Sequence, residues 1–288
     1  MDNLLFGSDP EVFVVEKKDN KEWALPVPFF INNYHAPVLE IDQDHKHPVL
    51  FKDNNYAIMM DGVAFEYTLP PVKTARDMFN NIQSGLNRLR DYASKLGYEV
   101  SIKPAVNYDF DRFYSERDTL SVQCGLFGCD RDWDAVLGNN YDSPSIDATK
   151  HPYRYGGGHF HMSDYNQLLR DYPIPMIKFM AICQGNYSIA HSKYLPLEKL
   201  RAWKYGQPAR YRIQNYKDGI TGIEYRTPSN HWIETLETIE GMFSYAQKAY
   251  SYLAARRLDI INEFLEPTIK AISEADASLA NRILTALP

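Results

Sequence analysis

The chain has 288 residues, a formal net charge of −6 and a hydrophobic fraction of 44%, which are ordinary values for a globular protein. The acidic balance and the lack of a basic stripe in the sequence argue against a general nucleic-acid binder. The apolar runs are too short to span a bilayer, and the N-terminal segment lacks the pattern of a signal peptide.

The first half of the chain predicts strands and one long helix. The expected order is a strand at 9–15, loops and hairpins over 23–56, a strand over 57–69, a helix from Thr74 to Gly97, a strand over 99–106 and loops over 107–157. Gly62 is expected at a bulge or bend of its strand. Thr74 and Asp77 resemble a capping box, and Gly97 follows the last residue of the apolar stripe, so together they delimit the helix.

The second half predicts one further strand, a hairpin and several helices. The expected order is a strand over 158–162, helices over 175–191 and 197–205, two strands joined at Asp218-Gly219, and helices from Trp232 to the end. The Asp-Gly pair between two strand-like runs is a strong hairpin signal. With neither a repeat nor a linker in the sequence, we expect a single mixed domain over 1–288, with a C-terminal helical region over 233–288.

The cysteine pattern gives no sign of a zinc site or a disulfide framework. The chain has three cysteines, Cys124, Cys129 and Cys183, which is an odd number. Cys124 and Cys129 have C-x4-C spacing, unlike the usual zinc-binding spacings, and no second pair accompanies them. We expect reduced thiols and a cytoplasmic protein.

Four short segments place ligand-type side chains in apolar, strand-like surroundings. These segments contain Asp9 and Glu11, Asp61 and Glu66, His159 and His161, and Glu224 and Arg226. Because residues i and i+2 of a strand share a face, the pairs converge if their strands belong to one sheet. Three carboxylate strands, one histidine strand and an adjoining arginine predict a site for a divalent metal ion and phosphate.

Each pair also has a plainer interpretation. An exposed strand edge accounts for Asp9 and Glu11 when they are taken alone, because charged residues are mostly exposed. A solvent-facing sheet accounts equally well for Glu66, and a turn accounts for Asp61. A salt network between neighbouring strands accounts for the glutamate–arginine pair.

The histidine segment carries the strongest single signal. Both rings of an H-x-H strand aim at one point, and histidine is the commonest metal ligand, so His159 and His161 predict a metal site. The glycines before them include Gly157 and Gly158, and they permit the close backbone approach that phosphate-binding loops require. The alternative is a flexible loop followed by two incidental histidines.

Four arginines are candidates for phosphate contacts. Arg226 lies beside the last carboxylate, Arg210 and Arg212 lie on the preceding strand, and Arg201 lies near a helix end. Guanidinium groups fork onto phosphate or carboxylate oxygens, which suits this role. The alternative for each of these arginines is a purely structural role. The sequence contains no P-loop, dinucleotide fingerprint or serine-elbow motif, so ATP binding would need other means.

Six sequence blocks occur in a fixed order: GSDPEVFV, DGVAFEYTLPP, FGC, GGGHFHM, YGQPARYR and GIEYRTPSNHW. In this order they resemble the phage-associated carboxylate–amine ligases, the type 2 amidoligase family, which is similar in fold to glutamine synthetase and glutamate–cysteine ligase. The resemblance covers about residues 5–235. It implies an α+β fold in which a curved, mostly antiparallel sheet holds ATP and Mg²⁺ or Mn²⁺ on its concave face, with helices behind.

The resemblance also implies roles for single residues. By this resemblance the metal ligands are Asp9, Glu11, Asp61, Glu66, His159 and Glu224. His161 lies nearer the nucleotide. The arginines around the substrate and the transferring phosphoryl group are Arg210, Arg212 and Arg226. Asp61, or a loop carboxylate such as Glu116 or Asp118, is a candidate general base. Hard oxygen ligands with one histidine suit magnesium or manganese better than zinc.

The function that these roles imply is ATP-dependent formation of an amide or peptide-like bond through an acyl phosphate. The expected partners are small-molecule or peptide carboxylates and amines, in the host cytoplasm if the chain is phage-encoded, and an oligomer is compatible with the sequence. Two other classes remain open. One is a metal-dependent hydrolase that uses the same carboxylate and histidine cluster, and the other is a non-catalytic phage interaction protein on a ligase scaffold.

Overall fold

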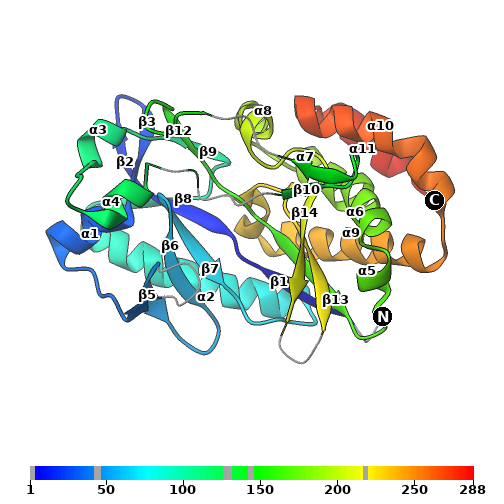
Figure 1. Cartoon of the computed structure of the whole chain (residues 1–288), viewed down its shortest axis with the longest axis horizontal. Coiled ribbons are helices and arrows are strands. Elements are labelled where there is room, and N and C mark those ends of the chain that lie inside the picture. Colours follow the sequence, from blue (N-terminus) through cyan, green and yellow to red (C-terminus); the bar gives the residue numbers. More distant parts are fainter. Residues whose placement is uncertain (1–3, 42–46, 126, 128–131, 142–145, 217–219) are drawn as a thin grey trace.

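The computed structural model describes residues 4–41, 47–125, 127, 132–141, 146–216 and 220–288 (Figure 1). Over these residues the fold is α+β, in which helices and two sheets rich in antiparallel strand pairs share one main hydrophobic core. The predicted mixture of helices and antiparallel strands is confirmed at this level. No helix in the described part of the chain is long and apolar enough to cross a membrane.

The first sheet joins strands that are far apart in the sequence. Within the described residues it has six strands, in the order β1 (Leu4–Ser8), β13 (Phe160–Asp164), β15 (Thr221–Tyr225), β14 (Arg210–Asn215), β10 (Asp132–Asp134) and β11 (Asn139–Tyr141). All of these neighbours pair antiparallel. Strands β14 and β15 form the predicted hairpin, but the expected turn at Asp218-Gly219 lies outside the described residues.

One face of this six-stranded sheet is apolar and covers the core. Phe6 of β1 and Phe160 of β13 both contact Phe243 of α9 (Leu236–Ala254), with ring centroids 4.6 and 5.5 Å apart. Trp232 joins the same cluster, 5.7 Å from Phe160. Because side chains alternate along a strand, the residues between these aromatic positions point to the opposite face of the sheet.

The second sheet is built mainly from the N-terminal half of the chain. Within the described residues it has nine strands: β12 (Tyr153–Tyr155), β9 (Ala105–Asn107), β3 (Lys21–Leu25), β2 (Glu11–Lys18), β7 (Ala64–Thr68), β6 (Ala57–Asp61), β5 (Pro48–Lys52) and β4 (Glu40–Ile41) in order, with β8 (Glu99–Ser101) paired to β2. Only β3 and β9 pair parallel in the described residues. In Figure 1, β2, β6 and β7 lie on the left, and β1, β13 and β14 lie on the right.

Helices follow or separate these strands along the chain. They are α1 (Val27–Tyr34), α2 (Ala75–Lys95), α3 (Phe110–Phe113), α4 (Thr119–Gln123), α5 (Leu168–Asp171), α6 (Pro173–Met180), the π-helical segment η1 (Ala181–Gly185), α7 (Asn186–Ala190), α8 (Leu195–Lys204), the 3₁₀ helix η3 (Asn230–Glu234), α9, α10 (Leu258–Glu274) and α11 (Ala277–Ala286). The helix predicted after Thr74 is confirmed as α2. Its cap is as predicted, because Thr74 Oγ1 accepts a hydrogen bond from Asp77 N at 3.1 Å.

The first predicted strand, over residues 9–15, begins only at Glu11 in the structure, where residues 11–15 lie in β2. Strand β1 ends at Ser8 and β2 begins at Glu11, so Asp9-Pro10 connects the two sheets. Proline has no backbone N–H to donate to a neighbouring strand, which favours a break at this point. The break places Asp9 at the junction between the sheets.

The stretch over 23–56, which the sequence predicts as loops and hairpins, also contains a helix, α1. Pro26 is its N-cap and Pro28 lies in its first turn, where a missing N–H removes no helical hydrogen bond. Prolines that suggest a helix breaker in the sequence therefore stand at the start of a helix.

The predicted strand over 57–69 folds back on itself as a hairpin. Strand β6 ends at Asp61 and β7 begins at Ala64, and these two residues are paired across the hairpin. Gly62 has a φ of 53°, the left-handed conformation that a tight turn needs. Because paired residues share a face, Asp61 and Glu66 lie on the same side of the sheet.

Candidate metal centre

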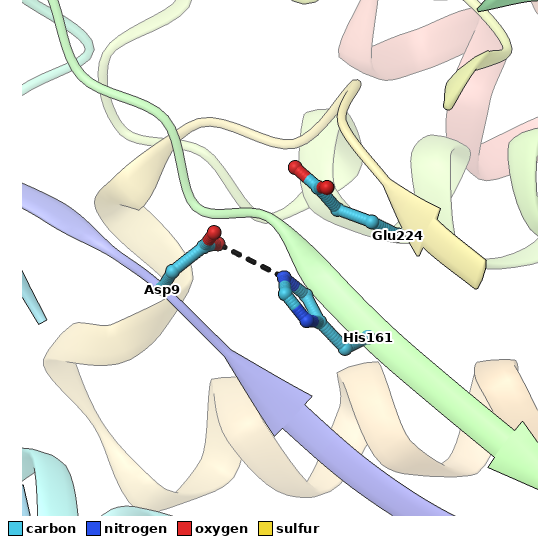
Figure 2. A group of neighbouring side chains, drawn as sticks. All are labelled: Asp9, His161 and Glu224. Atoms are coloured by element: carbon cyan, nitrogen blue, oxygen red, sulfur yellow. Dashed lines mark ion pairs between the residues drawn. The ribbon is translucent and has the colours of Figure 1, made fainter. Parts of the chain in front are cut away.

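Asp9 is at the centre of a group of ion pairs at the junction of the two sheets. Its Oδ1 atom lies 3.1 Å from Nδ1 of His159 and 3.1 Å from Nε2 of His161, and Figure 2 shows the second of these pairs. Burial acts to raise the pKa of Asp9, but the charges of His161 and His159 outweigh it and hold the pKa well below its usual range. Asp9 is therefore an ionised carboxylate.

The strand register brings His161 and Glu224 together. His161 of β13 pairs with Glu224 of β15, which in turn pairs with Arg212 of β14. These three residues thus form one row on the polar face of the six-stranded sheet. Gly7 of β1 is at the end of this row, opposite His161, and a Cβ atom on it would lie 3.4 Å from Cβ of the histidine.

Asp9, His161 and Glu224 together form a candidate metal-binding triad. Each offers one ligand atom, and these atoms all lie within 4.8 Å of one another. Figure 2 shows the three side chains on neighbouring segments, with Asp9 and Glu224 on either side of the histidine ring. The family resemblance placed His161 nearer a nucleotide, whereas the geometry groups it with two of the predicted metal ligands.

His159 lies in a second row, two residues further along the same face. Its Nδ1 atom is 3.3 Å from Oε1 of Glu224, in addition to its contact with Asp9. Arg226 and Arg210 continue this row on β15 and β14, and the Arg226 amide donates to the Arg210 carbonyl at 2.9 Å. The predicted strand pairs His159/His161 and Glu224/Arg226 therefore do converge on one face.

Glu224 is buried and held ionised by its neighbours. A guanidinium N–H of Arg226 donates to its Oε1 atom, and Nε2 of Gln214 donates to its Oε2 atom at 2.5 Å. Burial acts to raise the pKa of Glu224, but the charge of Arg226 and those of the two histidines lower it overall. An ionised carboxylate with one oxygen directed at His159 is suited to holding a cation.

The second sheet contributes three further carboxylates. Glu11 of β2 and Glu66 of β7 are directly paired, and Asp61 shares the face of Glu66. Burial raises the pKa of Glu66 well above its usual value, and the charges of Asp61, Asp9, Glu11 and Glu224 raise it further. Burial and the charge of Glu11 likewise raise the pKa of Asp61 to about 7. Together with Asp9 and Glu224, these three make five carboxylates that are close enough to repel one another.

The chemistry of this cluster fits a divalent cation. The Asp9 Oδ1 and His161 Nε2 atoms are buried and form an ion pair at 3.1 Å. A cation that takes the place of the histidine hydrogen would bind both atoms and would offset the repulsion among the carboxylates. Mostly oxygen ligands with one or two imidazole nitrogens suit Mg²⁺ or Mn²⁺.

Arginines border the carboxylate cluster on the side of β10. Oδ1 of Asp132 forms ion pairs with Nε of Arg226 at 2.7 Å and with Nε of Arg212 at 3.5 Å, and Asp134 lies 3.5 Å from the Arg210 guanidinium. The Arg212 side chain is 27% exposed, against 4% for Arg226. Arg212 is therefore better placed than Arg226 to reach a ligand from solvent.

Asp132 and Asp134 are site residues that the sequence analysis missed. They have the same i, i+2 spacing as the other pairs, in the segment DWD. That spacing was the available signal, but the segment lies within 107–157, which the sequence predicts as loops. The two carboxylates set the positions of the arginines instead of contributing to the metal triad.

Arg201, a predicted phosphate contact, has a different environment. Its guanidinium is buried and donates to the carbonyl oxygens of Thr227 and Pro228 at 2.8 and 3.0 Å. It also lies over the Tyr205 ring, 4.7 Å from the centroid. These contacts fix the backbone that follows β15, and none of them brings Arg201 to the carboxylates.

The glycine run before the histidines is closely packed by its own neighbours. The amides of Gly156, Gly157 and Gly158 donate to the Pro104 carbonyl, the Glu11 carboxylate and the Pro228 carbonyl. A Cβ atom on Gly158 would lie 2.2 Å from a backbone oxygen. The glycines thus serve close packing here, and their amides are not the open phosphate cradle that the sequence suggested.

Comparisons with family models and with curated proteins identify no relative. No family model matches the chain, and a search of curated proteins likewise finds no match. The arrangement of the described side chains is therefore the basis for a functional assignment.

Proposed function

We propose that this protein is an ATP-dependent carboxylate–amine ligase of the type 2 amidoligase kind, with a fold related to glutamine synthetase. The observation that carries the proposal is the convergence of five carboxylates and two histidines at the junction of two sheets, beside a group of arginines. The blocks that suggested the family supply these residues from separate strands, which supports a common purpose. The antiparallel character of both sheets is compatible with the proposed fold.

The carboxylates and histidines provide positions for more than one divalent ion. Asp9, His161 and Glu224 would hold one, and Glu11 with Glu66 would contribute to another, with Asp61 beside them. Bound Mg²⁺ or Mn²⁺ would neutralise the charge of the ATP phosphates. The ionised state of Asp9 and Glu224 prepares these ligands for a cation.

The arginines are suited to the phosphoryl-transfer step. A substrate carboxylate oxygen would attack the terminal phosphorus of ATP, releasing ADP and forming an acyl phosphate. Arg212, which is partly exposed, would stabilise the charge on the transferring group, and buried Arg226 would orient Glu224. Asp132 holds both guanidinium groups in place for this role.

The second step joins the amine to the activated acid. The amine nitrogen would attack the acyl carbon, inorganic phosphate would leave, and the nitrogen would lose one proton. Asp61 is a candidate acceptor for this proton because burial and the charge of Glu11 raise its pKa to about 7. The substrates would be small-molecule or peptide carboxylates and amines.

The experiment is a screen for ADP release with Mg²⁺, ATP and pools of carboxylic acids and amines. The wild type should release ADP over repeated turnovers only when both an acid and an amine are present. Glu66→Gln, which removes one carboxyl group of the cluster, should lower the rate by at least about 100-fold. Glu99→Gln, in an exposed ion pair with Lys17, should not change it. Metal-dependent ester or amide hydrolysis without ATP would instead favour a hydrolase.

A further inference from the structure

The hydroxyl group of Tyr205 joins three residues of the candidate metal centre. Tyr205 follows α8 and is only 5% exposed. Its hydroxyl oxygen lies 2.5 Å from Nε2 of His159 and donates a hydrogen bond to Oε1 of Glu11 at 3.0 Å. It also accepts from the Arg226 guanidinium at 3.4 Å. One tyrosine thus contacts two predicted metal ligands and one predicted catalytic arginine.

This contact connects the two sheets across the site. Glu11 begins β2 of the nine-stranded sheet, whereas His159 immediately precedes β13 of the six-stranded sheet. The packing around the contact is tight, because a Cβ atom on Gly157 would lie 2.5 Å from His159 Nε2 and 2.9 Å from the Tyr205 hydroxyl. The Gly157 amide also donates to the second oxygen of Glu11, at 2.7 Å.

The contacts of Tyr205 fix which nitrogen of His159 faces the carboxylates. A tyrosine hydroxyl has a single hydrogen, and Glu11 accepts it. With Glu11 as that acceptor, a hydrogen on Nε2 of His159 completes the 2.5 Å contact with Tyr205. The Nδ1 atom then faces Asp9 and Glu224 at 3.1 and 3.3 Å and is the ring nitrogen that a cation would take. A histidine whose second nitrogen is held by a hydrogen bond is the usual arrangement of a metal ligand.

We propose that Tyr205 is a positioning residue for the metal centre. Its hydroxyl ties Glu11 to His159 across the two sheets and presents Nδ1 of His159 to the space between Asp9 and Glu224. The inference rests on the proposed function, because it takes this cluster to be a metal site. It goes beyond that function by assigning a role to a residue that is not itself a ligand.

The variant Tyr205→Phe removes the hydroxyl and keeps the ring. Its matched control is Tyr155→Phe, because the Tyr155 hydroxyl also contacts a histidine, at 2.8 Å from Nε2 of His151. That contact lies outside the carboxylate cluster. Mn²⁺ binding is measured by electron paramagnetic resonance, with thermal unfolding of the metal-free proteins measured in parallel. We expect Tyr205→Phe to bind Mn²⁺ about 10-fold to 100-fold more weakly, with Tyr155→Phe unchanged.

The second readout is the hydrogen on the His159 ring, observed by long-range ¹H–¹⁵N correlation spectra of the metal-free protein. The wild type should carry it on Nε2, and Tyr205→Phe should lose this preference. Wild-type His159 without a hydrogen on Nε2 would overturn the inference even if the variant failed to fold. Equal Mn²⁺ affinity of wild type and Tyr205→Phe would overturn the inference alone. A wild type that binds neither Mn²⁺ nor ATP would overturn the proposed function as well.

Discussion

Glu11 and Glu66 stand directly opposite each other in the antiparallel pair of β2 and β7. Like charges at directly opposed positions of a sheet are destabilising, and here Glu11 is buried and Glu66 half-buried, with further carboxylates near them. Their repulsion is compensated if a cation sits between the sheets. The opposition of Glu11 and Glu66 is therefore explained better by cation binding than by the stability of the metal-free protein.

Replacing one member of this pair should stabilise the metal-free protein. Glu66→Gln keeps the shape of the side chain and removes its charge, so its free energy of unfolding should rise by about 0.5–1 kcal/mol at alkaline pH. The measurement is urea denaturation with a chelator present. The same variant should bind Mn²⁺ more weakly than the wild type. A loss of stability without metal would contradict the electrostatic interpretation of this pair.

The stability of the metal-free protein should fall as pH rises through neutrality. Burial and the charge of Glu11 raise the pKa of Asp61 to about 7, above its ordinary value of 3.8. A carboxyl group whose pKa is raised by folding contributes stability that is fully present below the ordinary value and is lost as pH rises through the raised value.

The stabilisation by metal should follow the opposite trend. Ionised carboxylates repel one another and bind cations best, so saturating Mn²⁺ should raise the unfolding temperature more at about pH 8 than at about pH 5.5. Thermal unfolding at the two pH values, with Mn²⁺ or with a chelator, measures this difference. A metal-induced shift that is larger at the acidic pH would count against the cluster as the binding site.

Asp132 should be important for stability as well as for the site. It compensates the buried guanidinium of Arg226, so Asp132→Ala should lower the free energy of unfolding by about 3–5 kcal/mol. Asp259→Ala, which removes an exposed ion pair with Arg257, is the control and should leave stability unchanged. Urea denaturation compares the two variants. An Asp132→Ala protein as stable as the control would show that Arg226 has sufficient compensation from its other contacts.

The thiols of Cys124 and Cys183 should be unreactive in the folded protein. Burial raises the pKa of each to about 12, so the nucleophilic thiolate is scarce at neutral pH. Alkylation with iodoacetamide, mapped by mass spectrometry, should modify both residues in urea and neither under native conditions. Rapid native alkylation of Cys183 would mean that its helical segment opens readily. Cys129 lies outside the described residues.

The sequence predicted well those features that depend on local patterns. The period of two along a strand placed His159 with His161 and Glu224 with Arg226, and the register confirms that His161 and Glu224 share a face. The cap at Thr74 predicted the start of α2. These features depend on residues close in the sequence, so propensity and spacing are sufficient to identify them.

Features that depend on pairing between distant strands could not be predicted in this way. The opposition of Glu11 and Glu66, and the division of the strands into two sheets, follow from long-range register. Asp132 has the same spacing to Asp134 as the other pairs, but it lies in a stretch that the sequence predicts as loops. No sequence signal pointed to Tyr205. Which histidine lies in the triad with Asp9 was likewise decided by the fold, which favours His161.

The most direct test is calorimetric titration of ATP with Mg²⁺ into the wild type and into the Glu11→Ala, Glu224→Ala double variant. A control with two exposed residues replaced, Glu40→Ala and Glu99→Ala, corrects for loss of net charge. We predict that the wild type and the control bind ATP and that the double variant does not. Tight binding of zinc or manganese by a wild type that does not bind ATP would contradict the ligase proposal and would favour a metal-dependent hydrolase.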